Sequence, residues 1–574
     1  MFLIFDTETT GLPIRDDAPL TDFENWPRAV QISWQLHDLE GKLVEVKDFV
    51  IRPDGFDIPY NAAKVHGITT EVAEHYGVPL EEAMAEFSEA VKKSKYLVGH
   101  NIQFDINILG CEYLRLGQDN LLEGMPDIDT SKETTNYCQL PGGKGGGFKY
   151  PKLEELYQKL FNEGFAEAHN AAADVEATTR AFLELVRIGV FTNERLDFSP
   201  EDKQAFLRNY PDTVQPIGLK VESFKELARK LREKSADGTT EVVEEVVDAS
   251  QEFVHLHVHT QFSILQATCE INDLIAKAKE LGMPAVAMTD HSNLYGAFQF
   301  VQTALKNDIK PILGCEFQVC RDHADKTVKD NGYQQVFIAK TKNGYHNLAK
   351  LSSIGYVDGF YYVPRIDKEL IQQYKDDLIA VTGNLYGEIP SLILNVGEKQ
   401  AEEAFVWYHE QFGDDFYVEL MRHGDATDEE REREDVVNQT LLRFAEKYGV
   451  KYFASNNVYY LSREDANAHD ILLCVKDSEY QSTPKGRGRG FRFGFPNEEF
   501  YFKSSTEMQE LFKDLPEAIS NTQRIAEQCH VNLTFDELHL PEYGTPEDED
   551  PDRESYKVFL DYSFQPQIFL LSTK

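Results

Sequence analysis

The stretch Phe2-Leu3-Ile4-Phe5-Asp6-Thr7-Glu8-Thr9-Thr10-Gly11 decides the fold of the first part of the chain. Its apolar residues predict a buried β-strand that runs from Phe2 to Asp6. Asp6 and Glu8 are two residues apart, so both carboxylates project from the same face of the strand. Because neighbouring carboxylates repel each other, the pattern favours bound cations. Mg²⁺ and Mn²⁺ prefer oxygen ligands, and phosphate-cleaving sites often hold two such ions about 4 Å apart.

Two further acids lie in suitable sequence contexts. Asp105 ends the stretch Gly-His-Asn-Ile-Gln-Phe-Asp, and Asp174 ends the stretch His-Asn-Ala-Ala-Ala-Asp. Asn170 is expected to cap the helix 171–186, which places Asp174 one turn inside that helix and His169 just before it. An imidazole at this place could take a proton from an attacking water.

Residues 1–190 alternate strand-like and helix-like stretches. Ala29–Leu36 predicts a strand, and Leu80–Ser94 and Ala171–Val186 show the apolar spacing of helices. We therefore expect an α/β domain. The glycine-rich stretch Gly142–Gly147 lacks the Gly-Lys-Ser/Thr ending of a phosphate-binding loop, so we expect a flexible surface loop there.

The motifs around Asp6, Asp105 and Asp174, taken in this order, resemble the three motifs of the DEDDh 3′→5′ exonucleases. This is the family of the proofreading subunit of bacterial DNA polymerase III. The resemblance implies a ribonuclease-H-like fold and two-metal hydrolysis, with Mg²⁺ or Mn²⁺, that releases mononucleotides from a 3′ end. Any one motif has little specificity, and the order and separation of all three favour this interpretation over ordinary polar residues. Carried over residue by residue, the resemblance makes five residues catalytic, with metal binding by Asp6, Glu8, Asp105 and Asp174 and the general base at His169.

A second α/β domain is expected to begin at residue 253, after a partly helical acidic linker at 191–252. Phe253–Thr260 predicts a strand, and Asn272–Leu281 predicts a helix that Gly282 stops. Pro284–Met288 begins the next strand. The alternation continues to about residue 535, which favours a parallel barrel or a layered sheet.

Histidines and acids occur at the ends of successive strands of this second domain. His257 and His259 alternate along the first strand, so their imidazoles share a face. Asp290 and His291 follow the next strand, and Glu316 closes the one after it. This mixture of ligands suits a cluster of transition-metal ions.

These residues resemble the PHP family, particularly the PHP domains that open bacterial DNA polymerase III α subunits, over about residues 253–543. The likeness implies a distorted βα barrel, and intact members bind up to three metal ions and hydrolyse phosphoesters. The sequence departs from the intact pattern at Gln266, Gln334, Asn384, Asn457 and Tyr459. Neutral amides and a phenol bind divalent metals poorly, so we expect an inactive or structural PHP domain. Six candidate ligands remain, which could hold a single ion or only satisfy one another's hydrogen bonds: His257, His259, Asp290, His291, Glu316 and His423.

Two segments near the end of the chain carry weaker indications of binding. The stretch Lys485–Phe495 interleaves basic and aromatic residues, and such a loop can contact phosphates and stack on bases. The candidate nucleic-acid contacts are Lys485, Arg487, Arg489 and Arg492. The alternative is a solvated loop whose aromatic side chains dock on the barrel. In the acidic and apolar tail 544–574, Gln565–Leu571 loosely resembles the short peptides that bind sliding clamps. The alternative is a disordered tail that binds no clamp.

The composition limits the function classes. The 574 residues include 98 acidic and 58 basic side chains, which argues against general adhesion to nucleic acid or to an anionic membrane. A nuclease of this charge needs metal ions or small basic patches to neutralise its substrate. The seven cysteines form no Cys-x-x-Cys pair and are expected to be reduced. Without a signal-peptide pattern or a long apolar run, a cytoplasmic protein is expected.

Together, the resemblances predict the amino-terminal part of a polymerase III α subunit with a proofreading exonuclease fused in front of it. The expected substrate is a single-stranded or frayed DNA 3′ end. The expected partner is the polymerase module, which would lie downstream unless the natural product ends here; a sliding clamp is a further candidate, and a membrane is not. Two alternatives stay open, an active PHP phosphoesterase or pyrophosphatase and a PHP scaffold between exonuclease, polymerase and clamp.

Overall fold

The structure of the protein is a computed structural model that describes residues 1–142, 146–165, 170–217, 223–235, 252–425, 428–486 and 490–533. Several sequence predictions fall outside these ranges, namely His169, Arg487, Arg489, residues 143–145 of the glycine-rich loop, the acidic segment 236–251 and the tail 544–574. Among the described residues, no helix is both long enough and apolar enough to cross a membrane.

The first sheet has five strands in the order β3-β2-β1-β4-β5. The central strand β1 (Phe2–Thr9) pairs antiparallel with β2 (Ala29–His37), which pairs antiparallel with β3 (Leu43–Val50). On its other side β1 runs parallel to β4 (Tyr96–Gly99), and β4 runs parallel to β5 (Asp127–Asp129). The strand that carries Asp6 and Glu8 therefore lies in the middle of the sheet, with neighbours on both sides.

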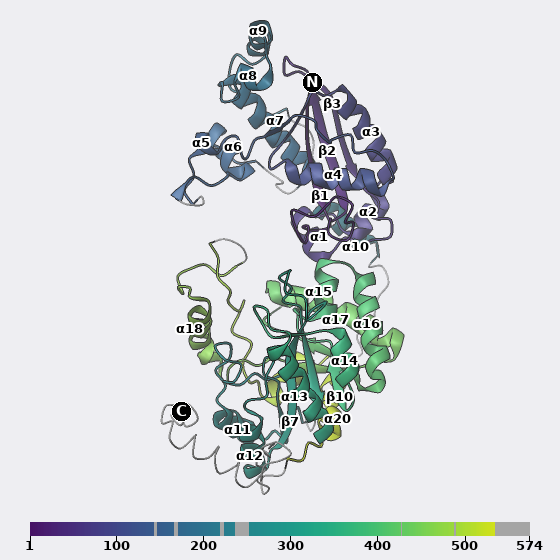
Figure 1. Ribbon diagram of the computed structural model, residues 1–574, viewed down its shortest axis with the longest axis vertical. Coiled ribbons are helices and arrows are strands. Elements are labelled where there is room, and N and C mark those ends of the chain that lie inside the picture. The colour runs from purple at the N-terminus through teal and green to yellow at the C-terminus, as the bar shows by residue number, and fades with distance from the viewer. Residues whose placement is uncertain are drawn as a thin grey trace, which may run out of the picture. The chain divides into compact units, whose positions relative to one another are not determined.

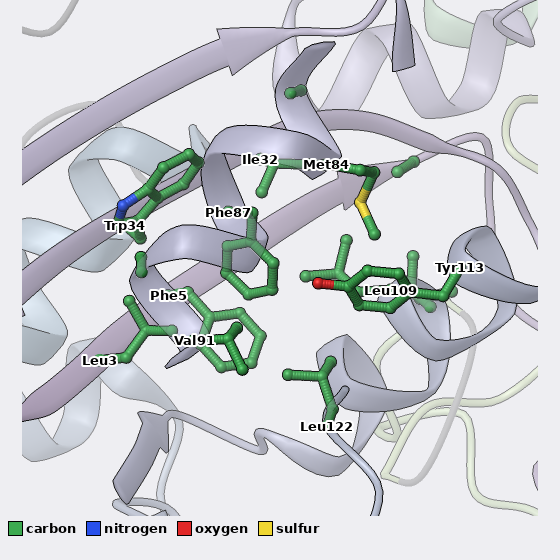
Figure 2. Close-up of a cluster of buried hydrophobic side chains, with 14 of the residues drawn as sticks. Leu3, Phe5, Ile32, Trp34, Met84, Phe87, Val91, Leu109, Tyr113 and Leu122 are labelled. Atoms are coloured by element: carbon green, nitrogen blue, oxygen red, sulfur yellow. The ribbon is translucent and has the colours of Figure 1, made fainter. Parts of the chain in front are cut away.

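Helices cover both faces of this sheet (Figure 1). Strand alternation sends Leu3 and Phe5 of β1 into a core with α3 (Leu80–Lys93) and α4 (Gln103–Arg115). Figure 2 shows this core, where the Phe87 ring lies edge-on to Phe5 and Trp34 with centroids 5.3 and 5.4 Å apart. Phe2 and Ile4 point the other way and pack against α7 (Ala171–Arg187). The fold confirms the expected α/β, ribonuclease-H-like architecture.

The core of this domain continues past residue 190, where the acidic linker was expected to begin. Phe191, Phe198 and Phe206 are buried in the same cluster as Phe2 and α7. These aromatic residues favour packing over the solvated linker that the local charge suggested. The shorter helices of the region are α1 (Tyr60–His66), α2 (Thr70–Tyr76), α5 (Thr135–Cys138), α6 (Leu153–Phe161), α8 (Asn193–Leu196), α9 (Pro200–Asn209) and α10 (Phe224–Ser235).

The second sheet curls around its own core and follows the order β12-β11-β10-β8-β7-β6, with β9 beside β7. Its strands are β6 (Ala285–Met288), β7 (Lys310–Val319), β8 (Tyr333–Ala339), β9 (Arg365–Ile366), β10 (Leu378–Val381), β11 (Phe416–Met421) and β12 (Lys451–Ser455). Strand β8 runs antiparallel to both of its neighbours, whereas the β6–β7 pair and the β10–β11–β12 group are parallel. The sheet is therefore a distorted version of a parallel barrel, as expected.

The segment 253–260, which was expected to be a strand, is extended but forms no regular ladder. The Ala287 N–H donates to the His255 carbonyl on one side, and the Val458 N–H donates to the His257 carbonyl on the other. The segment thus lies between the first strand of the sheet and the end of its last strand. Because its hydrogen bonds are shared between two neighbours, only the isolated bridge at Val258 has regular strand pairing.

Apolar residues from the strands meet inside the curl, including Leu256, Ala287 and Ile312. Ile525 of α20 packs against the same core. The helices of this region are α11 (Ile271–Glu280), α12 (Ala297–Lys306), α13 (Lys342–Val357), α14 (Lys368–Tyr374), α15 (Glu388–Asn395), α16 (Glu398–Phe412), α17 (Glu429–Tyr448), α18 (Ala466–Asp477), α19 (Ser505–Leu511) and α20 (Pro516–Gln528), with 3₁₀ turns η2 (Gly413–Asp415) and η3 (Arg463–Asp465).

Candidate active site

The first candidate site begins on β1. Asp6 and Glu8 are half-buried on one face of the strand, while Thr7 between them is buried on the opposite face. In the antiparallel pairing with β2, Asp6 lies opposite Ser33 and Glu8 lies opposite Gln31. The central position of β1 therefore fixes the backbone of both acids.

Helix α7 brings a third acid to this face. The Asn170 side chain caps the helix by accepting the Ala172 N–H at 3.1 Å, as the sequence predicted. Asp174 lies in the first turn, and its N–H donates to the Asn170 carbonyl at 2.9 Å. Carboxylate oxygens of Asp6, Glu8 and Asp174 all lie within 4.8 Å of one another. Three of the four predicted acids thus converge from two elements that are far apart in sequence.

Asp105 lies beside this group in the first turn of α4. Its Oδ1 accepts hydrogen bonds from the N–H and the hydroxyl of Thr7, at 3.0 and 2.7 Å. The side chain is buried, and its charge raises the pKa of both Asp6 and Glu8. Asp105 is therefore an electrostatic neighbour of the three acids, although its oxygens are not among those within 4.8 Å.

Burial and mutual repulsion both act on the acids of this site. Burial and the neighbouring acids raise the pKa of Glu8 to about 8, and burial raises that of Asp105 to about 7. Burial, followed by repulsion from Asp105, Asp174 and Glu8, raises the pKa of Asp6 well above its ordinary value. All-oxygen ligands of high negative charge are the donor set that hard divalent cations prefer. The residues present therefore fit the metal ions that the resemblance implies.

The sequence did not single out several residues that line the cavity beside these acids. Glu8, Leu12, Val65, His66 and Phe104 face the same cavity. Leu12 is 83% exposed and Val65 is 50% exposed, so both present apolar surface to solvent beside the acids. Burial lowers the pKa of His66 to about 4, so this imidazole is neutral near neutral pH. Leu12 follows the first motif and Phe104 lies inside the second, whereas no sequence pattern indicated Val65 or His66.

The second candidate site centres on His257, whose two ring nitrogens donate to two buried carboxylates. Nε2 lies 3.0 Å from Glu316, and Nδ1 lies 2.9 Å from Glu419, an acid that sequence reasoning missed. Burial alone would lower the pKa of His257, but Glu419 and Glu316 raise it to about 10. The imidazole is therefore a cation near neutral pH, held between two carboxylates.

The neighbouring candidate residues are also engaged by protein groups. The His259 ring lies against both His291 and Tyr459, with centroids 4.2 and 4.3 Å away, and its Nε2 lies 3.2 Å from the Asn457 side chain. His291 Nδ1 lies 2.6 Å from Glu316. Although burial favours its neutral form, His291 and His257 hold the pKa of Glu316 well below the usual range.

Asp290 and His423 do not join this group. Asp290 accepts three hydrogen bonds within the fold, at 2.6 to 2.7 Å, from the Thr260 N–H and from the hydroxyls of Thr260 and Ser263. His423 Nδ1 donates to Glu434, and its Nε2 faces the Asn456 carbonyl at 2.8 Å. Neither side chain is therefore turned toward His257.

The structure offers an observation for each interpretation of the PHP site, a single bound ion or mutual hydrogen bonds. Ligand atoms of His257, His259 and Glu316 lie within 4.8 Å of one another, which leaves room for a single ion. However, the same atoms already form the hydrogen bonds described above. The five departures from the intact pattern line one cavity of about 270 Å³, together with His291 and His423: Gln266, Gln334, Asn384, Asn457 and Tyr459.

The basic loop is anchored on the barrel where it is described. Arg492 is buried and forms a bidentate ion pair with Asp470, at 2.9 and 2.8 Å. Lys485 lies 3.3 Å from Asp470 and donates to the Phe495 carbonyl. The Phe495 ring packs edge-on against Tyr459 with centroids 4.7 Å apart. Arg492 is thus occupied inside the fold and is withdrawn as a candidate nucleic-acid contact, in agreement with the docking alternative.

Comparison with known proteins identifies two domains in the chain. The exonuclease family matches residues 3–182, and the PHP domain family matches residues 255–423. The chain is 41% identical over 299 residues to the DNA polymerase III subunit alpha of Borreliella burgdorferi, which covers 51% of this chain and 25% of that protein. It is 38% identical over 303 residues to the subunit alpha of Treponema pallidum, covering 52% and 25%. The chain thus spans about a quarter of the length of the curated relatives it matches.

Solved structures with a partial likeness include Escherichia coli Exonuclease I in complex with a 5cy-dT13 oligonucleotide. That likeness has 22% identity and a TM-score of 0.28, and covers 34% of this chain and 42% of that one. A 3′-exonuclease that recognises the histone mRNA stem-loop shares 13% identity at a TM-score of 0.26, over 33% of this chain and 82% of that one. The family matches place an exonuclease domain before a PHP domain in this chain, and the relatives are named DNA polymerase III subunit alpha.

Proposed function

We propose that residues 1 to about 190 form a DEDDh exonuclease that removes nucleotides from DNA 3′ ends and proofreads for a replicative polymerase. The observation that carries this proposal is the convergence of Asp6, Glu8 and Asp174 within 4.8 Å, in a domain that matches the exonuclease family. The replicative context is supported by relatives named DNA polymerase III subunit alpha.

Asp6, Glu8, Asp105 and Asp174 would hold two divalent ions. When bound, Mg²⁺ or Mn²⁺ would stabilise the negative charge that develops on the attacked phosphodiester. Thr7 orients Asp105 through its N–H and its hydroxyl. The resemblance assigns the general base to His169, which would take the proton of the attacking water.

Leu12, Val65 and Phe104 supply the binding surface for an unpaired end. Their apolar side chains line the same cavity as Glu8, so bases that have left the duplex can pack on them. Paired bases are already stacked in the duplex and gain less from this surface. A frayed or mismatched 3′ end is therefore the substrate that the site would favour.

The direct test is degradation of 3′-labelled oligonucleotides with Mg²⁺ or Mn²⁺. A single strand and a duplex with a terminal mismatch should lose mononucleotides faster than a fully paired duplex. Asp6→Ala and His169→Ala should abolish this release, whereas Lys513→Gln, at an exposed ion pair of the second domain, should not. Release that persists in Asp6→Ala would refute the assignment, and an RNA oligonucleotide in parallel decides the sugar preference.

The PHP domain is proposed as a non-catalytic scaffold for the polymerase module and the clamp, because protein groups already engage His257, His259 and Glu316. An active phosphoesterase is the competing candidate, since the same three residues could hold one ion. Hydrolysis of p-nitrophenyl phosphate or pyrophosphate decides between them. Turnover that survives Asp6→Ala and disappears in His257→Gln would establish the phosphoesterase.

A further inference from the structure

The face of β2 that packs against helix α7 is polar although it is buried. Gln31, Ser33, Gln35 and His37 occur at alternate positions of the strand, and each is at most 1% exposed. Burying such groups destabilises a protein unless each finds a hydrogen-bond partner. The partners of these side chains therefore indicate why the strand is not apolar.

Gln31 bonds directly to the beginning of α7. Its Oε1 accepts the N–H of Ala171, the first residue of the helix, at 3.1 Å. The first N–H groups of a helix have no partner within it, so this contact fixes the helix end. The Gln31 Nε2 also lies 3.4 Å from the side-chain oxygen of Asn170, the residue that caps the helix.

Asp48 on β3 sets the orientation of the Gln31 amide. Gln31 Nε2 donates to the Asp48 carboxylate at 2.7 Å, and the Ser33 hydroxyl donates to the same oxygen. Because an ionised carboxylate only accepts hydrogen bonds, the Gln31 NH₂ must face Asp48 and its carbonyl must face α7. The Gln31 amide therefore has only one orientation that satisfies both Asp48 and Ala171.

The register of the sheet places Gln31 beside the acids, on the same face of the sheet. Gln31 lies opposite Glu8, and Ser33 lies opposite Asp6. Residues directly opposite in an antiparallel pair share a face of the sheet. Gln31 thus connects the strand position of Glu8 to the helix end that carries Asp174.

We propose that Gln31 is a positioning residue of the exonuclease site, which sets the separation between the acids on β1 and Asp174 on α7. It also holds the helix cap that immediately follows His169. This inference rests on the proposed function for its catalytic consequence. Its structural consequence, the affinity of the acids for divalent ions, can be measured without catalysis.

The test compares Gln31→Leu with Gln35→Leu in the full chain. Gln35 is equally buried on the same face, and its amide donates to Glu176, beyond the first turn of α7. Each variant loses a buried amide, so both should unfold at lower temperature. Only Gln31→Leu should weaken Mn²⁺ binding, measured by calorimetry, and lower kcat, each by roughly 10- to 100-fold, the usual effect of removing a residue that orients metal ligands. Gln35→Leu should keep both values close to wild type.

A polarity reversal provides the second test. Gln31→Glu places a carboxylate against Asp48 and should weaken Mn²⁺ binding, whereas Gln31→Glu/Asp48→Asn restores a donor opposite that carboxylate and should recover the affinity. This pair decides the matter if Gln31→Leu does not fold. Wild-type Mn²⁺ affinity and kcat in a folded Gln31→Leu protein, or no recovery in the double variant, would overturn the inference. If the wild type lacks nuclease activity, the proposed function fails, and Mn²⁺ affinity alone still decides the role of Gln31.

Discussion

The two candidate sites are both built from buried carboxylates, but they differ in how that charge is balanced. In the exonuclease domain, burial and the neighbouring acids both raise the pKa of Asp6 and Glu8. In the PHP domain, Glu316 receives hydrogen bonds from histidines and its pKa falls. The acids of the first cluster thus repel one another, whereas the second cluster has a cation of its own in His257.

This difference explains how similar ligand types can have different functions. Divalent ions bind best where several carboxylates lie together, because the cations relieve the repulsion that raises the pKa of Asp6 and Glu8. A site whose imidazole is already protonated must lose that proton before the nitrogen can bind a metal. We therefore expect the exonuclease acids, and not the PHP histidines, to take up ions.

The largest expected effect separates the two sites by activity. Asp174→Asn removes a carboxylate of the exonuclease cluster and should lower kcat for 3′-end hydrolysis on the order of 1,000-fold, since the ions supply several kcal/mol of transition-state stabilisation. His257→Gln should leave kcat unchanged. Quenched-flow assays on a labelled single strand measure both, and equal losses in the two variants would remove the distinction between the sites.

The next effect is on stability. His257→Gln removes the cation that lies between the buried Glu316 and Glu419, which should lower the free energy of unfolding by about 3 to 5 kcal/mol. The double variant His257→Gln/Glu419→Gln also removes one of the two carboxylates and should recover part of the lost free energy of unfolding. Urea titration of the three proteins gives the values. An unchanged midpoint in His257→Gln would show that the imidazole carries no charge that matters to the fold.

Addition of metal should stabilise the protein through the exonuclease site. Mn²⁺ at 100 times its dissociation constant should add about 2.7 kcal/mol to the free energy of unfolding. Thermal denaturation should show this gain in wild type and in His257→Gln, but not in Asp6→Ala. A gain that depends on His257 rather than on Asp6 would assign the ion to the PHP site.

The smallest expected effect is a pH dependence in the presence of a chelator. The pKa of Glu8 rises from its ordinary value of 4.5 to about 8, so the folded protein holds this proton more tightly than the unfolded chain. The free energy of unfolding should therefore fall steadily as pH increases from about 4.5 to 8. Glu8→Gln should flatten the dependence in thermal denaturation, and a metal-free wild type that gains stability over this range would contradict the raised pKa.

The sequence predicted the parts of the fold that depend on local patterns. The strand at Phe2, the helix at Ala171 and its Asn170 cap follow from apolar spacing and capping chemistry, and the structure confirms them. The segment 253–260 was predicted as a strand because of its alternation, but its hydrogen bonds are divided between two neighbours. Such pairing depends on the closure of the whole sheet, which no local pattern reports.

The three acids that the structure brings together, Asp6, Glu8 and Asp174, lie in sequence motifs. Glu419 and Gln31 were missed because each lies inside a strand without a motif, and their roles come from partners that are distant in sequence. Arg492 was predicted as a nucleic-acid contact for the same reason. The sequence of a basic loop does not show that Arg492 forms an ion pair with the buried Asp470. Charge compensation of this kind is a property of tertiary contacts.

The most direct measurement of the difference between the sites is the number of Mn²⁺ ions bound at equilibrium, obtained by calorimetry or electron paramagnetic resonance. Wild type and His257→Gln/His259→Gln should bind two ions at the exonuclease acids, and Asp6→Ala/Asp174→Ala should lose both. Retention of the ions in the Asp6→Ala/Asp174→Ala protein, with loss in the histidine variant, would contradict the account.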